Sequence, residues 1–249
     1  MLSIMGLGLF NESDLTLRAI EEAKNSDKIY IELYTSKWHG DIRNLEKIIG
    51  KEVIELKRKD LEEESSKILH EAKARKIAIF VQGDPLVQTT HLSLLEEARK
   101  LGIKTKVVHN TSIISAIAET GLHSNKFGRY VTIPFPEKTK GKLPESVFEA
   151  IKENKKRGLH TLCLLDVVAD ENRYMKVNEA IDILLKGKII AKDEKIVVFA
   201  MAGSENPFMV YDSVKNLIEK NIEYTPAVIV VLGDLHYTEK GFLETYSPE

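Results

Sequence analysis

Short apolar runs separated by longer amphipathic segments set the strongest limit on how this chain can fold. Most of the runs are apolar over about four to six residues and are bounded by Gly, Asp or Pro. Such runs predict strands that are buried on both faces, as in parallel or mixed sheets covered by helices. The runs are Leu2–Leu7, Lys28–Tyr34, Ile77–Val81, Thr161–Leu165, Ile196–Met201 and Ala227–Leu232.

The segments between the runs carry apolar residues at helical spacing. Ile42, Leu45 and Ile49 fall on one face of a helix, and Val177 and Ile181 begin a similar series later in the chain. Strands that alternate with helices in this way predict an α/β fold with mostly parallel or mixed sheets.

The chain length of 249 residues suits one large domain or two modest ones, at about 150 residues per domain. The segment His109-Asn110-Thr111 ends an expected strand and begins the next helix. We therefore expect an N-terminal α/β domain over residues 1–110 and a C-terminal α/β domain over residues 111–249. The Pro- and Lys-rich stretch from Pro134 to Pro144 predicts an exposed loop in the second domain.

Composition argues against several classes of function. The formal net charge of −2 provides no overall basic surface, so nucleic acid is not expected as a partner. The chain lacks a long apolar run and a basic leader, so no membrane contact and a cytoplasmic location are expected. The single cysteine, Cys163, predicts a buried and inert thiol. No histidines have the spacing of metal ligands, so no metal site is expected.

Two glycines follow the first expected strand, where they allow a backbone to approach a ligand closely. They lie in Gly6-Leu7-Gly8, but the dinucleotide pattern G-x-G-x-x-G needs a third glycine where this chain has Asn11. Glu32, near the end of the second expected strand, is in a position to act as the acidic residue that binds a ribose hydroxyl. The hypothesis of a nicotinamide-dependent enzyme is therefore weakened but kept. A tight turn explains the glycines equally well.

Three further segments follow expected strands, at the end where ligands bind in open α/β sheets. Gly83-Asp84-Pro85 presents a carboxylate to a cationic or hydroxyl-bearing ligand, or forms a turn in which the aspartate bonds its own backbone. A helix is expected to begin at Asn110-Thr111-Ser112-Ile113. Its free N–H groups and hydroxyls either bind a ligand or serve only to cap the helix. Small residues follow another expected strand at Met201-Ala202-Gly203-Ser204. They either allow a flat ring to approach the backbone closely or simply begin a loop.

Several longer motifs occur in a distinctive order along nearly the whole chain. They are Gly6-Leu-Gly-Leu with Ser13-Asp14-Leu15-Thr16, Leu33-Tyr34-Thr35-Ser36, Gly83-Asp-Pro-Leu-Val-Gln-Thr-Thr-His91, Thr120-Gly-Leu-His-Ser-Asn-Lys-Phe-Gly128, Arg157-Gly-Leu-His-Thr-Leu162 and Ala202-Gly-Ser-Glu-Asn-Pro207. In the sequence and order of these motifs, the chain resembles the diphthine synthases, which are methyltransferases of the tetrapyrrole-methylase-like group.

The resemblance implies two α/β domains with S-adenosylmethionine (SAM) in the cleft between them, and a homodimer. It also implies repeated methylation of an amino group on the aminocarboxypropyl arm of a modified histidine in translation elongation factor 2. The SAM contacts that it implies are Leu9, Asp84, Val87, Ser112, Ile113, Leu165, Ala202 and Ala227. Met201 departs from the family pattern, where Arg is frequent, and Ala227 stands where some relatives have a polar residue such as His.

The methyl donor is an activated sulfonium, so alignment of the reactants is the main task and no catalytic base is assigned. Tyr34 is a candidate to face the quaternary ammonium product. The Lys138–Lys142 loop is a candidate to contact the protein substrate or is simply solvated surface. Methylation of a tetrapyrrole or other small molecule, a non-catalytic nucleotide-binding module and a dehydrogenase remain as alternatives.

Overall fold

The computed structural model describes residues 1–247 of the chain. Its internal contacts divide the protein into two units, Met1–Ile114 and Ser115–Glu249. The division falls within helix α6 (Ile113–Ala116), shortly after Asn110, where the sequence suggested a boundary. Each unit contains its own five-stranded sheet.

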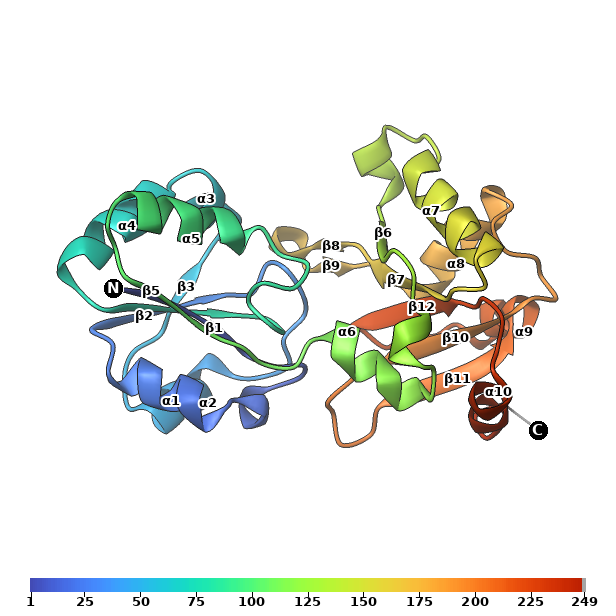
Figure 1. Ribbon diagram of the computed structural model, residues 1–249, viewed down its shortest axis with the longest axis horizontal. Coiled ribbons are helices and arrows are strands. Elements are labelled where there is room, and N and C mark those ends of the chain that lie inside the picture. The colour runs from blue at the N-terminus through green and yellow to red at the C-terminus, as the bar shows by residue number, and fades with distance from the viewer. Residues whose placement is uncertain (248–249) are drawn as a thin grey trace. The chain divides into compact units, whose positions relative to one another are not determined.

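The sheet of the first unit is entirely parallel, with the strand order β3-β2-β4-β1-β5. Figure 1 shows α1 and α2 on one side of this sheet and α4 and α5 on the other. The strands are β1 Leu2–Gly6, β2 Lys28–Glu32, β3 Ile54–Leu56, β4 Ile77–Val81 and β5 Thr105–Val108, and the helices are α1 Leu17–Lys24, α2 Ile42–Ile49, α3 Arg58–Glu62, α4 Ser65–Ala74 and α5 His91–Lys100, with a 3-10 turn at Glu12–Asp14.

Burial explains why the central strands are mostly apolar. Every residue of β1 and of β4 is buried, because helices cover both faces of the sheet. Local signals fix the helix ends. The hydroxyl of Thr16 accepts a hydrogen bond from the N–H of Ala19 at the start of α1, and Gly50 ends α2 with a φ of 75°.

The second unit has a mixed sheet with the order β11-β10-β12-β7-β6, in which only β6 and β7 are parallel neighbours. Its strands are β6 Val131–Ile133, β7 Thr161–Leu165, β10 Lys195–Ala200, β11 Phe208–Ser213 and β12 Ala227–Val231, and its longer helices are α7 Glu145–Lys156, α8 Val177–Lys186, α9 Val214–Lys220 and α10 Tyr237–Glu244. Short 3-10 turns lie at Ile117–Thr120, Ser124–Lys126, Pro136–Thr139 and Ala169–Glu171.

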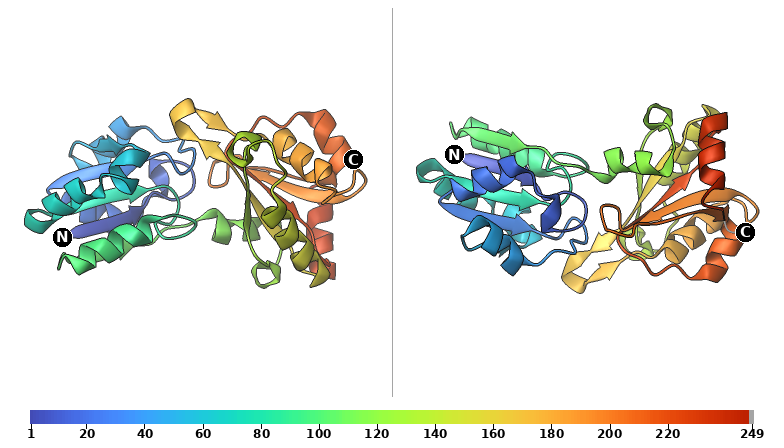
Figure 2. Two further views of the ribbon diagram at one scale, coloured as in Figure 1. Left: turned by 90° about the horizontal axis from the view of Figure 1, so that it is seen from above. Right: turned by 90° about the horizontal axis from the view of Figure 1, so that it is seen from below.

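A separate two-stranded hairpin, β8 Val167–Val168 and β9 Arg173–Tyr174, leaves the second sheet after β7. Figure 2 shows it in gold, projecting from the sheet in both views. The α/β fold with one parallel and one mixed sheet confirms the architecture expected from the apolar runs.

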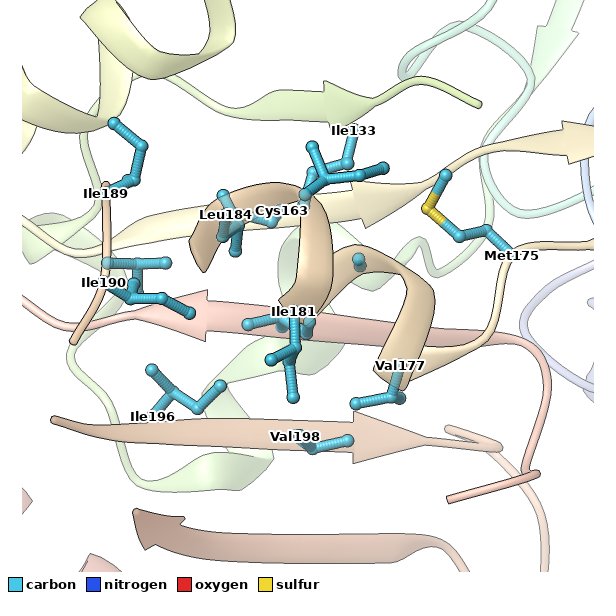
Figure 3. Packing of buried hydrophobic residues seen from close by; sticks show 14 of the residues in the cluster. Ile133, Cys163, Met175, Val177, Ile181, Leu184, Ile189, Ile190, Ile196 and Val198 are labelled. Carbon is cyan, nitrogen blue, oxygen red and sulfur yellow. The ribbon is translucent and has the colours of Figure 1, made fainter. Parts of the chain in front are cut away.

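The core of the second unit lies between its sheet and helices α7, α8 and α9. Figure 3 shows Ile181 and Leu184 of α8 among side chains from the sheet, with Cys163 beside Leu184. Cys163 is completely buried, and burial raises the pKa of its thiol to about 12. The thiol is therefore an inert part of the core, as its position in an apolar run predicts.

Candidate active site

Three loops meet at the carboxyl edge of the first sheet, after the adjacent strands β4, β1 and β5. The backbones of Gly8 and Gly83 exchange hydrogen bonds, with N···O distances of 3.3 and 2.8 Å. The amide of Asn110 donates to the carbonyls of Gly6 and Asp14, each at 3.0 Å. These bonds hold the three strand-end loops against one another.

Only glycine fits where the first two loops cross. A Cβ on Gly6 would lie 2.4 Å from the carbonyl oxygen of Gly83 and 2.6 Å from the Cβ of Asn110. Gly8 has a φ of +86°, and a Cβ there would lie 2.4 Å from the Cβ of Asp14. Gly6 is the last residue of β1, not a residue after it, and close packing requires a glycine there. Gly8, in the loop that follows, is required by its backbone conformation and by the neighbouring side chain of Asp14.

Asp84 lies in the loop after β4 and is only 6% exposed. Its Oδ1 accepts a hydrogen bond from the N–H of Leu86 at 3.0 Å, which is the self-bonded turn that the sequence left open. Its Oδ2 lies 2.8 Å from Nδ1 of His109 and 3.3 Å from the N–H of Asn110. The carboxylate is thus fixed by the loops after two different strands.

The other residues predicted on this unit lie along the same edge. Leu9 is half-buried, and its N–H donates to Oδ2 of Asp14 at 3.1 Å. Val87 is half-buried and closes a turn on the carbonyl of Asp84. A Cβ on Gly83 would lie 3.8 Å from the Cβ of Ser112, which places the third loop beside the second.

Ile113 is the first residue of α6 and is half-buried beside buried Ser112. The structure therefore brings the five N-terminal candidates to one edge of one sheet. Gln82 was not predicted, although it also follows β4. Its amide donates to the carbonyls of Gly8 and Leu9 at 3.3 and 3.0 Å, and its buried Oε1 has no partner among the described residues.

Glu32 does not suit the role of a ribose-binding acid. Its side chain is completely buried, and its Oε1 accepts a hydrogen bond from the hydroxyl of Thr35 at 2.6 Å. Burial raises the pKa of Glu32 to about 7, although hydrogen bonds from Thr35 and from backbone N–H groups oppose the rise. A carboxyl with no exposed surface cannot contact a nucleotide. The nicotinamide-dependent alternative therefore has no ribose-binding acid at Glu32.

Tyr34, a candidate to face a quaternary ammonium, is also enclosed. The residue is 5% exposed, and the guanidinium of Arg58 lies 5.0 Å from the centre of its ring. A protein cation therefore covers the aromatic face that a ligand cation would need. The structure thus offers no exposed face of Tyr34 to such a product.

The candidates on the second unit lie at one end of the strands β7, β10 and β12 of the mixed sheet. Strand β12 runs antiparallel to both β7 and β10, so its first residues lie beside the last residues of those strands. Ala227, which begins β12, pairs with Ala200, and Ala202 follows two residues later. Leu165 ends β7 next to Leu164, the partner of Val228.

The corner that carries Ala202 has an unusual backbone. Met201 has a φ of 55°, a region that L-residues other than glycine seldom adopt. Its N–H donates to the carbonyl of Pro226 at 2.9 Å, immediately before Ala227. The buried hydroxyl of Ser204 has no partner among the described residues. Small side chains and an unpartnered hydroxyl thus occupy this corner.

The first lysine of the Lys138–Lys142 loop has a structural role. Nζ of Lys138 lies 2.7 Å from Oδ1 of Asp166, whose Oδ2 accepts a hydrogen bond from the N–H of Phe135 at 2.8 Å. Asp166 directly follows the candidate Leu165 in the chain. Lys140 and Lys142 are exposed. The loop therefore combines one lysine that fastens it to the end of β7 with two solvated ones.

Residues 1–247 contain no cluster of three or more His, Cys, Asp or Glu side chains that could hold a metal ion. No helix in the same range is long and apolar enough to cross a membrane.

Comparison with known families defines the class of protein. The profile of the family described as Tetrapyrrole (Corrin/Porphyrin) Methylases matches residues 1–218. This match covers the whole first unit and most of the second, including every candidate residue except Ala227. The chain is therefore an α/β methylase of this group.

Individual relatives narrow the family. The chain is 42% identical to diphthine synthases of Methanococcus aeolicus and Methanocaldococcus jannaschii, in each case over 98% of its length and at least 97% of theirs. Its structure matches a crystal structure of diphthine synthase with a TM-score of 0.91 at 33% identity, covering 100% of this chain and 97% of that one. A putative diphthine synthase from Entamoeba histolytica matches with a TM-score of 0.90 at 31% identity, covering 100% and 99%.

The chain thus belongs to the diphthine synthase family within the tetrapyrrole methylases. Its class of activity is SAM-dependent methyl transfer, which confirms the enzyme class expected from the motifs.

The residues at the two edges fit SAM chemically. SAM carries cationic and hydroxyl groups that need acceptors, and the first unit offers the fixed carboxylate of Asp84. It also has a flat adenine ring, and the small side chains of Ala202 and Ala227 on the second unit are of the size that allows a flat ring to approach a backbone closely.

Proposed function

We propose that this enzyme methylates the amino group of the aminocarboxypropyl arm on a modified histidine of translation elongation factor 2, a step of diphthamide biosynthesis, with SAM as methyl donor. Similarity to diphthine synthases over nearly the entire chain carries the proposal. The site supports it, because the five candidates of the first unit follow the carboxyl ends of parallel strands, where ligands bind in open α/β sheets. The three candidates of the second unit lie together at one end of its mixed sheet.

We assign SAM binding to one set of residues on each unit, namely Leu9, Asp84, Val87, Ser112 and Ile113 in the first, and Leu165, Ala202 and Ala227 in the second. When bound, SAM supplies a methyl group on a sulfonium, which needs no further activation. The residues of the chain bind and orient the reactants, and such alignment can lower a barrier by about 7–11 kcal/mol. Asp84 orients the donor through its charge, since its geometry is fixed before any ligand arrives.

The proposal includes the partners and location of the enzyme. The protein substrate acts in translation, so we place the enzyme in the cytoplasm. We also infer a homodimer, which a measurement of molecular mass in solution tests directly. Of the lysine loop, Lys140 and Lys142 remain available to contact the elongation factor, whereas Lys138 is held by Asp166.

Mass spectrometry of elongation factor 2 tests the reaction. Factor that carries the aminocarboxypropyl arm should gain methyl groups when it is incubated with this protein and SAM, and unmodified factor should gain none. A free small molecule that copies the arm should react far more slowly, because it lacks the remote contacts that orient the arm. Equal reaction of the free arm would instead favour a small-molecule methyltransferase.

Thermal unfolding tests the cofactor. A ligand that binds only the folded protein stabilises it by about 2.7 kcal/mol at one hundred times its dissociation constant. SAM and S-adenosylhomocysteine should therefore raise the melting temperature, and NAD and ATP should not. Stabilisation by NAD alone would contradict the proposed cofactor.

A further inference from the structure

The residue that follows β5 forms a pair with the candidate cofactor ligand Asp84. Nδ1 of His109 lies 2.8 Å from Oδ2 of Asp84, across 25 residues of sequence. The two partners differ sharply in exposure, because the side chain of His109 is 69% exposed and that of Asp84 only 8%. The pair therefore joins an accessible imidazole to an enclosed carboxylate.

The carboxylate is a fixed partner for the ring. Its two oxygens also accept hydrogen bonds from the backbone N–H groups of Leu86 and Asn110, so it cannot turn away without leaving them unpaired. An ionised carboxylate only accepts hydrogen bonds, so Nδ1 of His109 carries the hydrogen in this pair. When the ring is neutral, this tautomer presents Nε2 with a free lone pair, and Nε2 makes no hydrogen bond within residues 1–247.

Other titratable groups at this edge are less suited to take a proton from a substrate. Glu32 is completely buried, and His91 is 3% exposed. Oδ2 of Asp14 already accepts hydrogen bonds from the backbone N–H groups of Leu9 and Phe10. His109 combines exposure, an unpaired acceptor atom and an orienting carboxylate, which is the arrangement of a histidine base in many enzymes.

We propose that His109 is the base that removes a proton from the substrate amine before each methyl transfer, with Asp84 holding the ring in the Nδ1–H tautomer. The assignment rests on the proposed function, since it requires an amine as methyl acceptor. It adds a catalytic group to a site for which the sequence predicted cofactor contacts alone.

The proton balance shows why a base is useful. The arm enters mainly as an ammonium ion, since α-amino groups titrate at about pH 7.7–8.0. Nε2 of His109 takes one proton, and the freed nitrogen lone pair forms the bond to the methyl carbon as the carbon–sulfur bond breaks. That bonding electron pair stays on sulfur, which becomes a neutral thioether. The imidazolium then releases its proton to water, so each methyl group transferred yields one proton.

The substitution His109→Asn separates this role from cofactor binding. The asparagine amide can still donate to Asp84 from the position of Nδ1, but it offers no basic nitrogen. We expect SAM affinity within about twofold of wild type and a single-turnover methylation rate on the modified elongation factor lower by about 100-fold or more at neutral pH. The control His70→Asn removes an exposed histidine of α4 and should change neither quantity.

The pH dependence distinguishes a lost base from lost alignment. The ratio of the wild-type methylation rate to the rate of His109→Asn should fall from about pH 7 to about pH 9. A growing share of the substrate amine is already neutral at the higher pH and needs no base. In the free wild-type protein, at a pH where the ring is neutral, 15N NMR should show the hydrogen of His109 on Nδ1 and none on Nε2.

Distinct results would overturn the assignment. A His109→Asn protein that methylates at the wild-type rate, or one whose deficit is constant with pH, excludes His109 as the base. Parallel loss of SAM affinity shows that His109 supports the cofactor loop instead, and a protonated Nε2 excludes the tautomer. If the wild-type protein transfers no methyl group to the modified elongation factor, the proposed function itself fails, and this assignment fails with it.

Discussion

Replacing the buried carboxyl of Glu32 by the amide in Glu32→Gln should change how stability depends on pH. Glu32 is completely buried at the end of β2, and burial raises its pKa from 4.5 to about 7. Below about pH 4.5 the carboxyl is protonated in both the folded and the unfolded chain, so it causes no pH-dependent loss. Between about 4.5 and 7 only the unfolded chain has released the proton, so stability falls as the pH rises.

The size of the effect follows from the same pKa values. A rise from 4.5 to about 7, at about 1.36 kcal/mol per pKa unit, amounts to roughly 3 kcal/mol. The full cost is reached above about pH 7, where the folded protein must hold the buried charge. A glutamine keeps the acceptor for the Thr35 hydroxyl and carries no charge. Glu32→Gln should therefore match wild type within about 1 kcal/mol near pH 5 and exceed it by roughly 3 kcal/mol near pH 8.

Urea unfolding followed by tryptophan fluorescence measures this difference in the relevant unit. The chain has a single tryptophan, Trp38, which packs against the core of the first unit. Glu32 belongs to the same unit, so tryptophan fluorescence reports its unfolding. The control Glu55→Gln removes the same charge from an exposed position on β3 and should keep the wild-type pH dependence. If Glu32→Gln and wild type show the same change in unfolding free energy from about pH 5 to about pH 8, the reasoning is wrong.

Three further variants test the strand ends of the first unit and the lysine loop of the second. Asp84→Asn keeps the acceptor for the turn but loses the charge, so the protein should fold and SAM affinity in calorimetry should fall by about tenfold or more. Gly6→Ala should lower the free energy of unfolding by about 1–3 kcal/mol in urea, because a Cβ would lie 2.4 Å from a backbone oxygen. Neutralising Lys140 and Lys142 should slow methylation of the elongation factor at low salt and leave SAM binding intact. Lys138 is left in place, since it is paired with Asp166.

The sequence predicted the buried strands well because their apolar pattern is set by burial alone. The runs at Ile77–Val81 and Thr161–Leu165 coincide with β4 and β7. Strand β11, Phe208–Ser213, escaped prediction because its burial varies along the strand and it lies at the edge of the sheet, paired only with β10. The short β6 and the hairpin of β8 and β9 carry too few residues to show a pattern.

The candidate site was predictable only as a set of strand ends. Small and polar residues after apolar runs indicated Asp84 and Ala202, because loops after buried strands need such residues. The pairing of Asp84 with His109 was not predictable, since it depends on which strand lies next to β1. Sequence order does not give sheet order, so a contact across 25 residues appears only in the folded chain. The enclosure of Glu32 has the same cause, because its neighbours come from β3 and β4.

Positions 201 and 227, at which the resemblance led us to expect Arg and a polar residue, are neighbours in the fold. The N–H of Met201 donates to the carbonyl of Pro226, the residue before Ala227, at 2.9 Å. Strand β12 begins at this corner because it runs opposite to β10, whose last residue, Ala200, pairs with Ala227. A basic residue at one position and a polar one at the other would therefore lie side by side, and this chain lacks both. The corner is held by backbone hydrogen bonds, which do not depend on the side chains. The shape of the corner can thus persist whichever side chains occupy these two positions.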